Sequence, residues 1–580
     1  MSSIAIAGYG GTGVITTGQL LLKSAAKSGF FGLAQRSFGP QIRGGESLSL
    51  LRFSEQQVLS PDDYYDLVVL LDTDHVARFR GELPLNVDST VILGSIGAKV
   101  PDFVTESGAQ VVEYPLDDLS NETADGGENI VVTGLVGYYL GLELEVLVSI
   151  VQKHFAHKTE LLSKAELWLA SGWEFATTQK RSFNISLDVE QSAKSAESPD
   201  WVINGSEVCG YGALEAGVRF VAAYPITPAS GILEWMAPGL ERLGGSLIQA
   251  EDELASINMI IGASFGGVPS MTATSGPGLA LMTESIGLAV ASETPLVVVN
   301  VMRGGPSTGI PTKSEQSDLN IALHGLHGDA PHIVTAMLSI ADSAYTTGWS
   351  VWLAEHLQVP VITLSDQSMA QSDASISEPS LWPEKAQRLY AAEADTPYER
   401  YALTHTGISP MAIPGEEDMM YTADGLEHDI KGTPSAATEV HQEQLAKRAK
   451  KLTQFDYGTD WAEIQGEGDK LILCWGSVSQ VAIDAQQRLG KGYKVIALRL
   501  LAPLQVDALR EAIGEARQIL IVEQSHGAQF RAWLRAHMDF PCPHISLALP
   551  GPLPIRPRQI LKAFAQFEQL ATEVEHVANC

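Results

Sequence analysis

The residues best suited to chemistry lie between Ala222 and Asp318, in three short blocks that follow apolar runs. The blocks are Tyr224-Pro225-Ile226-Thr227-Pro228, Glu251-Asp252-Glu253-Leu254-Ala255-Ser256 and Arg303-Gly304-Gly305-Pro306-Ser307-Thr308-Gly309. Between the second and third blocks lies a small-residue turn, Ser275-Gly276-Pro277-Gly278. Polar groups that follow buried strands are typical of a ligand site at the carboxyl edge of a parallel sheet.

Glu253 is the carboxylate that stands out in the second block. We expect Leu247–Ala250 to form a buried strand that leads into a small-residue helix from Ala255 to Gly266. Acidic residues are favoured at a helix N-terminus by its dipole, so Glu251 and Asp252 also fit an ordinary helix start. Glu253 leads a helix that has very few polar groups. A carboxyl group held out of water is usable as a proton donor or as a hydrogen-bond partner to a ring nitrogen.

Thr227 and Arg303 also occupy positions from which a polar side chain would face a site. Pro228 holds the backbone of Thr227 outside the helical region, so the hydroxyl group is presented at a defined angle. The apolar run Leu296–Met302 indicates a buried strand whose end opens at Arg303. The alternative for Arg303 is a surface charge before a Gly-Gly loop.

These blocks, in this order, resemble the α subunit of the 2-oxoacid:ferredoxin oxidoreductases. The resemblance covers nearly all of the 580 residues, and within the family the chain looks most like the γ-α fused form of the 2-oxoglutarate member. It implies an enzyme that decarboxylates 2-oxoglutarate oxidatively with coenzyme A, giving succinyl-CoA and CO2. The electrons pass to ferredoxin, or the reaction runs in reverse to fix CO2.

The resemblance implies thiamine diphosphate as the cofactor. In the family, the glutamate at the position of Glu253 hydrogen-bonds N1′ of the aminopyrimidine ring, and the cofactor supplies the carbanion chemistry. The other residues implied to contact thiamine diphosphate are Tyr224, Pro225, Ile226, Gly276, Pro277 and Gly278.

The resemblance also implies how the substrate binds. Thr227 matches the threonine that contacts the substrate, and Arg303 matches the arginine that holds the 2-oxoacid, where a planar guanidinium group suits a carboxylate. Glu253, Thr227 and Arg303 are therefore the expected catalytic residues. Ser307, Thr308 and Lys313 complete the expected substrate-binding set, although Lys313 also fits an exposed lysine.

One expected motif is missing from the sequence. Thiamine diphosphate enzymes of this type hold Mg2+ with a Gly-Asp-Gly motif followed by an Asn, and no Gly-Asp-Gly occurs here. The four cysteines lie at 209, 474, 542 and 580, without the spacing of a metal or cluster site, so we expect no metal in this chain. The resemblance implies a shared site, in which a β subunit brings Mg2+ and a 4Fe-4S cluster to an (αβ)2 heterotetramer.

An N-terminal glycine turn gives a second candidate site. Gly8-Tyr9-Gly10-Gly11-Thr12-Gly13 satisfies G-x-G-x-x-G between an expected strand, 4–7, and an expected helix, Val14–Ser28, as in dinucleotide sites. An NAD ribose requires an acid about 20 residues further on, and none occurs from Met1 to Gly45. A phosphate-rich ligand other than NAD fits the basic residues of this stretch, which are Lys23, Lys27, Arg36 and Arg43.

The resemblance identifies that ligand as coenzyme A. The segment Ser37–Gly45 looks like the loop of the γ domain that the family associates with this co-substrate. The implied contacts are Gly8, Gly10, Gly11, Gly13 and Arg43. For Arg43, a solvated loop charge is the alternative.

The order of apolar segments predicts an α/β protein of several domains. The expected central strands are 217–222, 246–250, 270–273, 296–301 and 359–364, in a doubly wound parallel sheet. With the resemblance, we divide the chain into a Rossmann-like γ domain (1–185), a linker (186–199), a transketolase-like pyrimidine domain that binds thiamine diphosphate (200–371), an inserted segment (372–468) and a transketolase C-terminal-like domain (469–580).

Composition limits the partners. The net charge of −31 argues against nucleic acid, which requires a basic face. The same charge repels an acidic ferredoxin, so we expect acceptor docking to belong mainly to the β subunit. No apolar run is long enough for a membrane span, and no leader precedes the first strand, so we expect a cytoplasmic protein without a membrane partner.

Three alternatives stay open from the sequence. The substrate of the same chemistry could be pyruvate or another 2-oxoacid. The glycine turn could serve an NAD-dependent dehydrogenase. The chain could also be a non-catalytic scaffold subunit that retained the fold.

Overall fold

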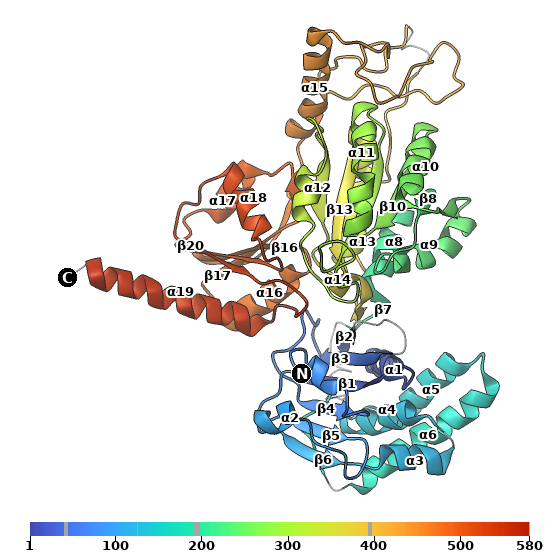
Figure 1. Cartoon of the computed structure of the whole chain (residues 1–580), viewed down its shortest axis with the longest axis vertical. Coiled ribbons are helices and arrows are strands. Elements are labelled where there is room, and N and C mark those ends of the chain that lie inside the picture. Colours follow the sequence, from blue (N-terminus) through green and yellow to red (C-terminus); the bar gives the residue numbers. More distant parts are fainter. Residues whose placement is uncertain (40–44, 125, 180, 189–197, 393–396, 579–580) are drawn as a thin grey trace. The chain divides into compact units, whose positions relative to one another are not determined.

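The computed structural model describes residues 1–39, 45–124, 126–179, 181–188, 198–392 and 397–578. They divide into two units, coloured along the chain in Figure 1. The first comprises Met1–Asn204 with Gln371–Glu378 and Leu553–Gln559; the second comprises Gly205–Ala370 with Pro379–Pro552 and Ile560–Cys580. Most of the predicted linker, 186–199, and Arg43 lie outside the described residues.

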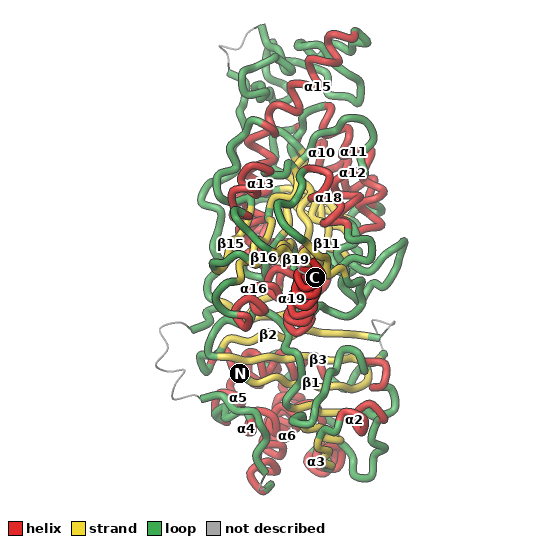
Figure 2. Tube along the Cα trace, turned by 90° about the vertical axis from the view of Figure 1, so that its left-hand side faces the viewer, coloured by secondary structure: helices red, strands yellow, loops and turns green. Residues whose placement is uncertain are grey.

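The described residues of the first unit form an eight-stranded sheet with the order β6-β5-β4-β1-β3-β2-β14-β7. β1 pairs parallel with β4 but antiparallel with β3, and the strands β1, β2 and β3 lie next to one another in Figure 2. The sheet is therefore mixed. Its strands are β1 (Ser2–Tyr9), β2 (Phe31–Phe38), β3 (Glu46–Ser54), β4 (Leu67–Leu70), β5 (Thr90–Leu93), β6 (Gln110–Glu113), β7 (Trp201–Asn204) and β14 (Asp373–Ile376).

Helices cover this sheet. α4 is apolar on nearly all sides and is buried over most of its length, as expected of a helix without a polar face. The helical elements are α1 (Val14–Lys27), the 3-10 helix η1 (Val76–Phe79), α2 (Asp102–Ser107), α3 (Leu116–Thr123), α4 (Glu128–Tyr139), α5 (Leu144–Phe155) and α6 (Thr159–Thr178).

The described part of the second unit contains a seven-stranded sheet with the order β18-β12-β13-β11-β10-β8-β9. All pairs are parallel except β12 with β18. β10, β11 and β13 are buried at every position, as parallel strands between helices are. The strands are β8 (Phe220–Ala223), β9 (Ser246–Gln249), β10 (Ser270–Thr274), β11 (Leu296–Met302), β12 (Ile333–Ala336), β13 (Pro360–Asp366) and β18 (Leu500–Ala502).

Two details of the central sheet differ from the sequence prediction. The expected strand at 217–222 begins only at Phe220, because Gly217 has a φ of 110° and ends the preceding helix turn. The strand predicted at Leu247–Ala250 was expected to be buried, but the observed strand, β9, is mostly exposed. β9 lies at the edge of the sheet and, among the described strands, pairs only with β8.

Helices follow the strands of this sheet. α10 and α11 pack against each other and lie side by side in Figure 1. The helices are α8 (Gly205–Ala216), α9 (Ser230–Arg242), α10 (Glu253–Phe265), α11 (Gly276–Ala291), α12 (Leu319–His324), α13 (Asp342–Leu357), α14 (Gln367–Gln371) and α15 (Thr438–Thr453).

A second sheet of the second unit has, in its described residues, the order β15-β17-β16-β19-β20. The three central strands are buried over most of their length, whereas the edge strand β15 is largely exposed and the edge strand β20 is half-buried. The elements are β15 (Ala462–Gly466), β16 (Lys470–Trp475), α16 (Val478–Leu489), β17 (Tyr493–Leu498), α17 (Val506–Ile513), β19 (Gln518–Glu523), α18 (Gln529–His537), β20 (His544–Ala548) and α19 (Pro557–Ala578).

The segment between β14 and α15 has little regular structure, and buried ion pairs hold it and α15 to the central sheet. Arg388 pairs with Glu355 at 2.8 Å. From the basic run on α15, Lys447 and Lys451 are buried and pair with Glu293 at 2.6 and 3.0 Å. Among the described helices, none combines the length and the apolar composition that a membrane crossing requires.

Candidate active site

Three neighbouring strands of the central sheet end at the same edge. β8, β10 and β11 run parallel, so the residues that follow them meet at their carboxyl ends. The segments that follow are Tyr224–Thr227 after β8, Ser275–Gly278 after β10 and Arg303–Gly305 after β11. The first and third predicted blocks and the small-residue turn therefore reach one edge of the sheet, and the second block follows β9, which pairs parallel with β8.

Glu253 is the buried acid of its block. Asp252 caps α10, since its Oδ1 accepts a hydrogen bond from Ala255 N at 2.7 Å. Glu251 and Asp252 are exposed, whereas Glu253 is only 7% exposed. A methyl group on Gly278 would stand 2.8 Å from Cγ and Oε1 of Glu253. The carboxyl group therefore lies directly against the first turn of α11.

Buried hydroxyl groups occur at that first turn and in β10, the strand that precedes it. Ser275 is the N-cap residue of α11, and Pro277 occupies the first turn, where its missing N–H is tolerated. The Oγ of Ser275 and the Oγ1 of Thr272 are buried without a hydrogen-bond partner among the described residues. Because buried hydroxyl groups normally have partners, these two atoms indicate room for a bound polar group.

Arg303 joins the first and third blocks. Its side chain is buried, with 7% exposure, and Nη1 donates a hydrogen bond to the carbonyl oxygen of Thr227 at 2.5 Å. The Nε of Arg303 has no partner among the described residues. Burial lowers the pKa of Arg303, and the nearby Asp318 opposes this. A buried guanidinium group with an unused N–H is suited to an anion.

Asp318 and Asn300 belong to the same cluster, and sequence reasoning missed both. Asn300 Nδ2 donates to Asp318 Oδ2 at 3.0 Å, and a methyl group on Gly276 would stand 2.7 Å from that oxygen. Burial raises the pKa of Asp318; the Asn300 hydrogen bond and Arg303 oppose the rise. Two features of the sequence could have pointed to them: Asn300 is an amide within the apolar strand β11, and Asp318 is an acid at the start of α12.

The loop after Arg303 folds back on itself. Gly304 N donates to Lys313 O at 3.0 Å, and Ile310 N donates to Gly304 O at 2.8 Å. Gly309 has a φ of 56°, and a methyl group there would overlap Gly304 O, so this close approach requires glycine. Ser307 and Thr308 lie at the exposed tip of the loop.

The end of this loop is anchored to the second sheet of the same unit. The backbone N–H of Gln316 donates to Gln524 O, and the backbone N–H of Gln524 donates to Gln316 Oε1, both at 2.8 Å. Gln316 Nε2 also donates to Trp475 O at 2.8 Å. The loop is thus held firmly near Asp318, while its tip is exposed.

Tyr224, Pro225 and Ile226 follow β8 at the same edge. Tyr224 and Pro225 are exposed, and Ile226 is half-buried against the central core. Exposed apolar side chains at this edge of the sheet are typical of a binding surface.

The N-terminal glycine turn is observed between β1 and α1, as predicted. Gly13 has a φ of 75°, and a methyl group there would collide with Asn129, whose Nδ2 donates to Gly13 O at 3.4 Å. Gly8 is buried, while Gly10 and Gly11 are at least partly exposed. β1 lies beside the antiparallel β3, so the turn is not part of the all-parallel unit that dinucleotide sites use.

The basic residues near this turn do not gather at it. Arg36 pairs with Asp373 at 3.0 Å. Lys23 and Lys27 lie toward the other end of α1. Arg43 is outside the described residues.

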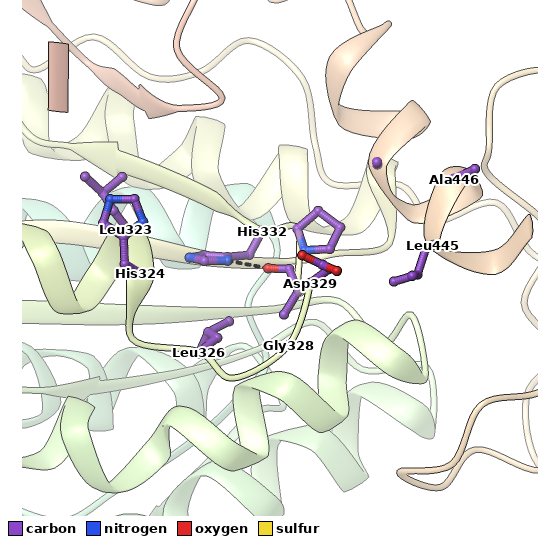
Figure 3. A pocket seen from close by; sticks show the side chains of 11 residues that line it. Leu323, His324, Leu326, Gly328, Asp329, His332, Leu445 and Ala446 are labelled. Atoms are coloured by element: carbon purple, nitrogen blue, oxygen red, sulfur yellow. Dashed lines mark hydrogen bonds between the residues drawn. The ribbon is translucent and has the colours of Figure 1, made fainter. Parts of the chain in front are cut away.

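A pocket of about 660 Å3 lies elsewhere in the second unit, between α15 and the loop after α12 (Figure 3). The ring nitrogens of His332 lie 2.8 Å from Ala330 O and 2.7 Å from Ala322 O, and so hold that loop. The lining residues include no predicted site residue, so this pocket is separate from the candidate active site. Within the described residues, no group of three or more His, Cys, Asp or Glu could hold a metal ion.

Comparisons with known proteins agree with this arrangement. Residues 211–447 match the family model described as "Pyruvate flavodoxin/ferredoxin oxidoreductase, thiamine diP-bdg". Residues 3–174 match the model described as "Pyruvate ferredoxin/flavodoxin oxidoreductase". The first match contains the whole candidate site, and the second contains the glycine turn.

Relatives match over most of the chain. The 2-oxoacid:ferredoxin oxidoreductase subunit alpha of a Sulfolobus species is 30% identical over 90% of this chain and 90% of its own. The 2-oxoglutarate oxidoreductase subunit KorA of Mycobacterium tuberculosis is 29% identical over 82% of this chain and 77% of its own. Both relatives are named as subunits.

A solved structure matches the fold over nearly the whole chain. It is the 2-oxoglutarate:ferredoxin oxidoreductase from Magnetococcus marinus, with 2-oxoglutarate, coenzyme A and succinyl-CoA bound. It is 31% identical, covers 97% of this chain and 99% of its own, and has a TM-score of 0.88. These matches confirm the predicted fold class, an α/β protein of several domains with a thiamine diphosphate-binding domain. The chain belongs to the α-subunit family of the 2-oxoacid:ferredoxin oxidoreductases.

Proposed function

We propose that this chain is the α subunit of a CoA-dependent 2-oxoglutarate:ferredoxin oxidoreductase and supplies half of a thiamine diphosphate site. The observation that carries the proposal is the buried Glu253 carboxyl group, which lies against Gly278 at the strand edge where Arg303 also emerges. Thiamine diphosphate, when bound, supplies the carbanion that makes decarboxylation of a 2-oxoacid feasible.

The residues at this edge fit that cofactor. Glu253 would hold a proton between its carboxyl group and N1′ of the aminopyrimidine ring. The unpartnered Oγ of Ser275 offers a hydrogen bond at the start of α11. Gly276 and Gly278 keep the first turn of α11 free of side chains, so a ring could approach its backbone. Tyr224, Pro225, Ile226 and Pro277 would form the apolar surround of the ring.

Arg303 and Thr227 would bind the substrate. The unused Nε–H of Arg303 suits the 1-carboxylate of a 2-oxoacid, and its bond to Thr227 O fixes the orientation of both residues. The second carboxylate of 2-oxoglutarate requires further polar groups. Ser307, Thr308 and Lys313 are the residues of the adjoining loop that would supply them.

The site would be completed by a β subunit. Between Glu253 and Phe265, α10 has no charged residue after its first position, and Leu254 and Met259 are exposed. On the neighbouring α11, Leu281 is 52% exposed. An exposed apolar surface of this kind is typical of an interface with another polypeptide. The β subunit would bring Mg2+ and a 4Fe-4S cluster, form an (αβ)2 heterotetramer and dock ferredoxin, in the cytoplasm.

Coenzyme A would be the second substrate, bound by the first unit. The glycine turn Gly8–Gly13 supports this, since its partly exposed backbone could approach a phosphate group. The bound coenzyme A of the Magnetococcus marinus structure supports the same co-substrate.

The test uses the chain reconstituted with its β subunit, with reduction of a low-potential dye as the readout. Glu253→Gln should lower kcat by at least about 100-fold, the size of a typical acid–base contribution, without lowering Tm. Glu251→Gln is the matched control, because that carboxylate is exposed. If Glu253→Gln retains full activity, the proposed role of Glu253 is wrong. A panel of 2-oxoglutarate, pyruvate and bulkier 2-oxoacids then identifies the substrate.

A further inference from the structure

A pocket of about 580 Å3 in the first unit is lined by basic side chains from two helices. Lys23 and Lys27 come from α1, and Lys153 and His154 come from α5. Its remaining lining residues are Ala26, Ile150, Pro199, Asp200 and Val202. The lining therefore combines apolar side chains with several basic ones.

The positive charge is not neutralised by the described residues around it. Lys27 Nζ donates to the hydroxyl group of Ser149 at 2.5 Å, which is a neutral partner. Lys23 and Lys153 form no ion pair with any described residue. Counting three lysines against Asp200, the lining has a net charge of +2, with His154 neutral. This is unusual in a chain whose net charge is −31.

Helix dipoles explain only part of this arrangement. Lys27 on α1, and Lys153 and His154 on α5, lie in last turns, where positive charge is favourable. Lys23 lies four residues before Lys27, on the same face of α1, and like charges at this spacing destabilise a helix. Burial lowers the pKa of His154, and Lys23 and Lys158 lower it further. The positive groups therefore repel one another across the pocket.

We propose that this pocket binds a small anion with at least two negative charges, of the kind that a diphosphate group presents. Three lysine ammonium groups act as point charges suited to phosphate oxygens, and the bound anion would relieve their mutual repulsion. The pocket is distinct from the glycine turn, because Lys23 and Lys27 lie about 15–20 Å beyond Gly13 along α1, at a rise of about 1.5 Å per residue. The proposal does not rest on the proposed catalytic function.

The first experiment is a calorimetric titration of the full chain with inorganic pyrophosphate, at low ionic strength and without magnesium. The double variant Lys23→Gln/Lys153→Gln should bind about tenfold more weakly, since each exposed ion pair contributes only a few-fold. Lys164→Gln, an exposed lysine of α6 outside the pocket, is the control and should bind as the wild type does. The proposal is wrong if pyrophosphate does not bind, or if the double variant binds it equally well.

The second measurement is the titration of His154 by NMR, with His154→Gln used to assign its ring signal. A bound anion should raise the pKa of His154, because it offsets the charges of Lys23 and Lys158. An unchanged His154 titration in saturating pyrophosphate would place the anion elsewhere and overturn the proposal. Coenzyme A is then added to the pyrophosphate-bound chain. If coenzyme A displaces pyrophosphate, the phosphate groups of coenzyme A are the natural occupant of the pocket. If pyrophosphate stays bound, the natural occupant is a free anion.

Discussion

The carboxyl group of Glu253 lies against the backbone of Gly278. It has room there because Gly278 has no side chain: a methyl group on Gly278 would stand 2.8 Å from Oε1 of Glu253. The two residues belong to different helices: α10 follows β9 and α11 follows β10, two strands that β8 separates in the central sheet. The contact can therefore be tested by a substitution at Gly278, which leaves the carboxyl group of Glu253 in the protein.

Gly278→Ala should displace Thr274 Oγ1, which a methyl group would overlap, together with Glu253, which it would approach to 2.8 Å, and should impair catalysis. Overpacking of this kind costs about 1–3 kcal/mol, so we expect a kcat at least tenfold lower in the reconstituted complex and a Tm lower by a few degrees. Gly287→Ala is the matched control on the same helix, since a methyl group there would lie 4.0 Å from its nearest neighbour. Equal activity of the two variants would show that Glu253 does not require its observed position.

Arg303→Lys should weaken binding of the 2-oxoacid. Lysine keeps the charge but loses the planar group that bonds Thr227 O and leaves Nε for the substrate. Loss of a partner in a buried charged pair costs about 2–5 kcal/mol, so kcat/KM should fall at least about 30-fold. Steady-state kinetics measure this, with Arg242→Lys, an exposed residue at the end of α9, as the control. A change in kcat alone would contradict a role in substrate binding.

Sequence patterns predicted the parts of the fold that have continuous apolar segments. The strands that are buried on both faces, such as β11 and β13, were expected within a few residues of their observed bounds. β12 was missed, because it is only four residues long and follows an irregular loop. β9 was expected to be buried, but pairing order, which the sequence does not encode locally, makes it an edge strand.

The candidate site was predictable where a motif was specific. Glu253, Thr227 and Arg303 were found because each follows an apolar segment within a recognisable block. Asp318 and Asn300 were missed because their link is a tertiary contact between residues that have ordinary separate explanations. The contact between Glu253 and Gly278 likewise depends on how α10 packs on α11.

Asp318→Asn should change how stability depends on pH. The folded chain raises the pKa of Asp318, so the carboxyl group contributes stability that is present below its unfolded pKa and is lost as pH rises through its folded pKa. Asparagine does not titrate and can still accept the hydrogen bond of Asn300. The Tm of the variant should therefore rise relative to that of the wild type as pH increases above the usual pKa of an aspartate. Thermal melts at several pH values measure this; a constant difference would contradict it.

Glu293→Gln should strongly destabilise the second unit. Glu293 is fully buried between Lys447 and Lys451, and its carbonyl oxygen accepts a hydrogen bond from Arg400 at 2.8 Å. Removing one partner of a buried ion pair costs about 3–5 kcal/mol, so Tm should fall by about 10 °C. Glu284→Gln, an exposed residue of α11, the helix that ends just before Glu293, should leave Tm unchanged.

The same cluster predicts a rise in stability above neutral pH. Burial lowers the pKa of Lys447 to about 7, although the pairing with Glu293 opposes the shift. A lysine with a lowered folded pKa contributes stability that is present above its unfolded pKa and is lost as pH falls through about 7. Wild-type stability should thus increase from pH 7 toward pH 10 by this contribution. Lys447→Met has no group to titrate and fills a similar volume, so its Tm should vary less over this range. If both chains show the same dependence, Lys447 remains charged in the fold, and the ion pair with Glu293 outweighs the effect of burial.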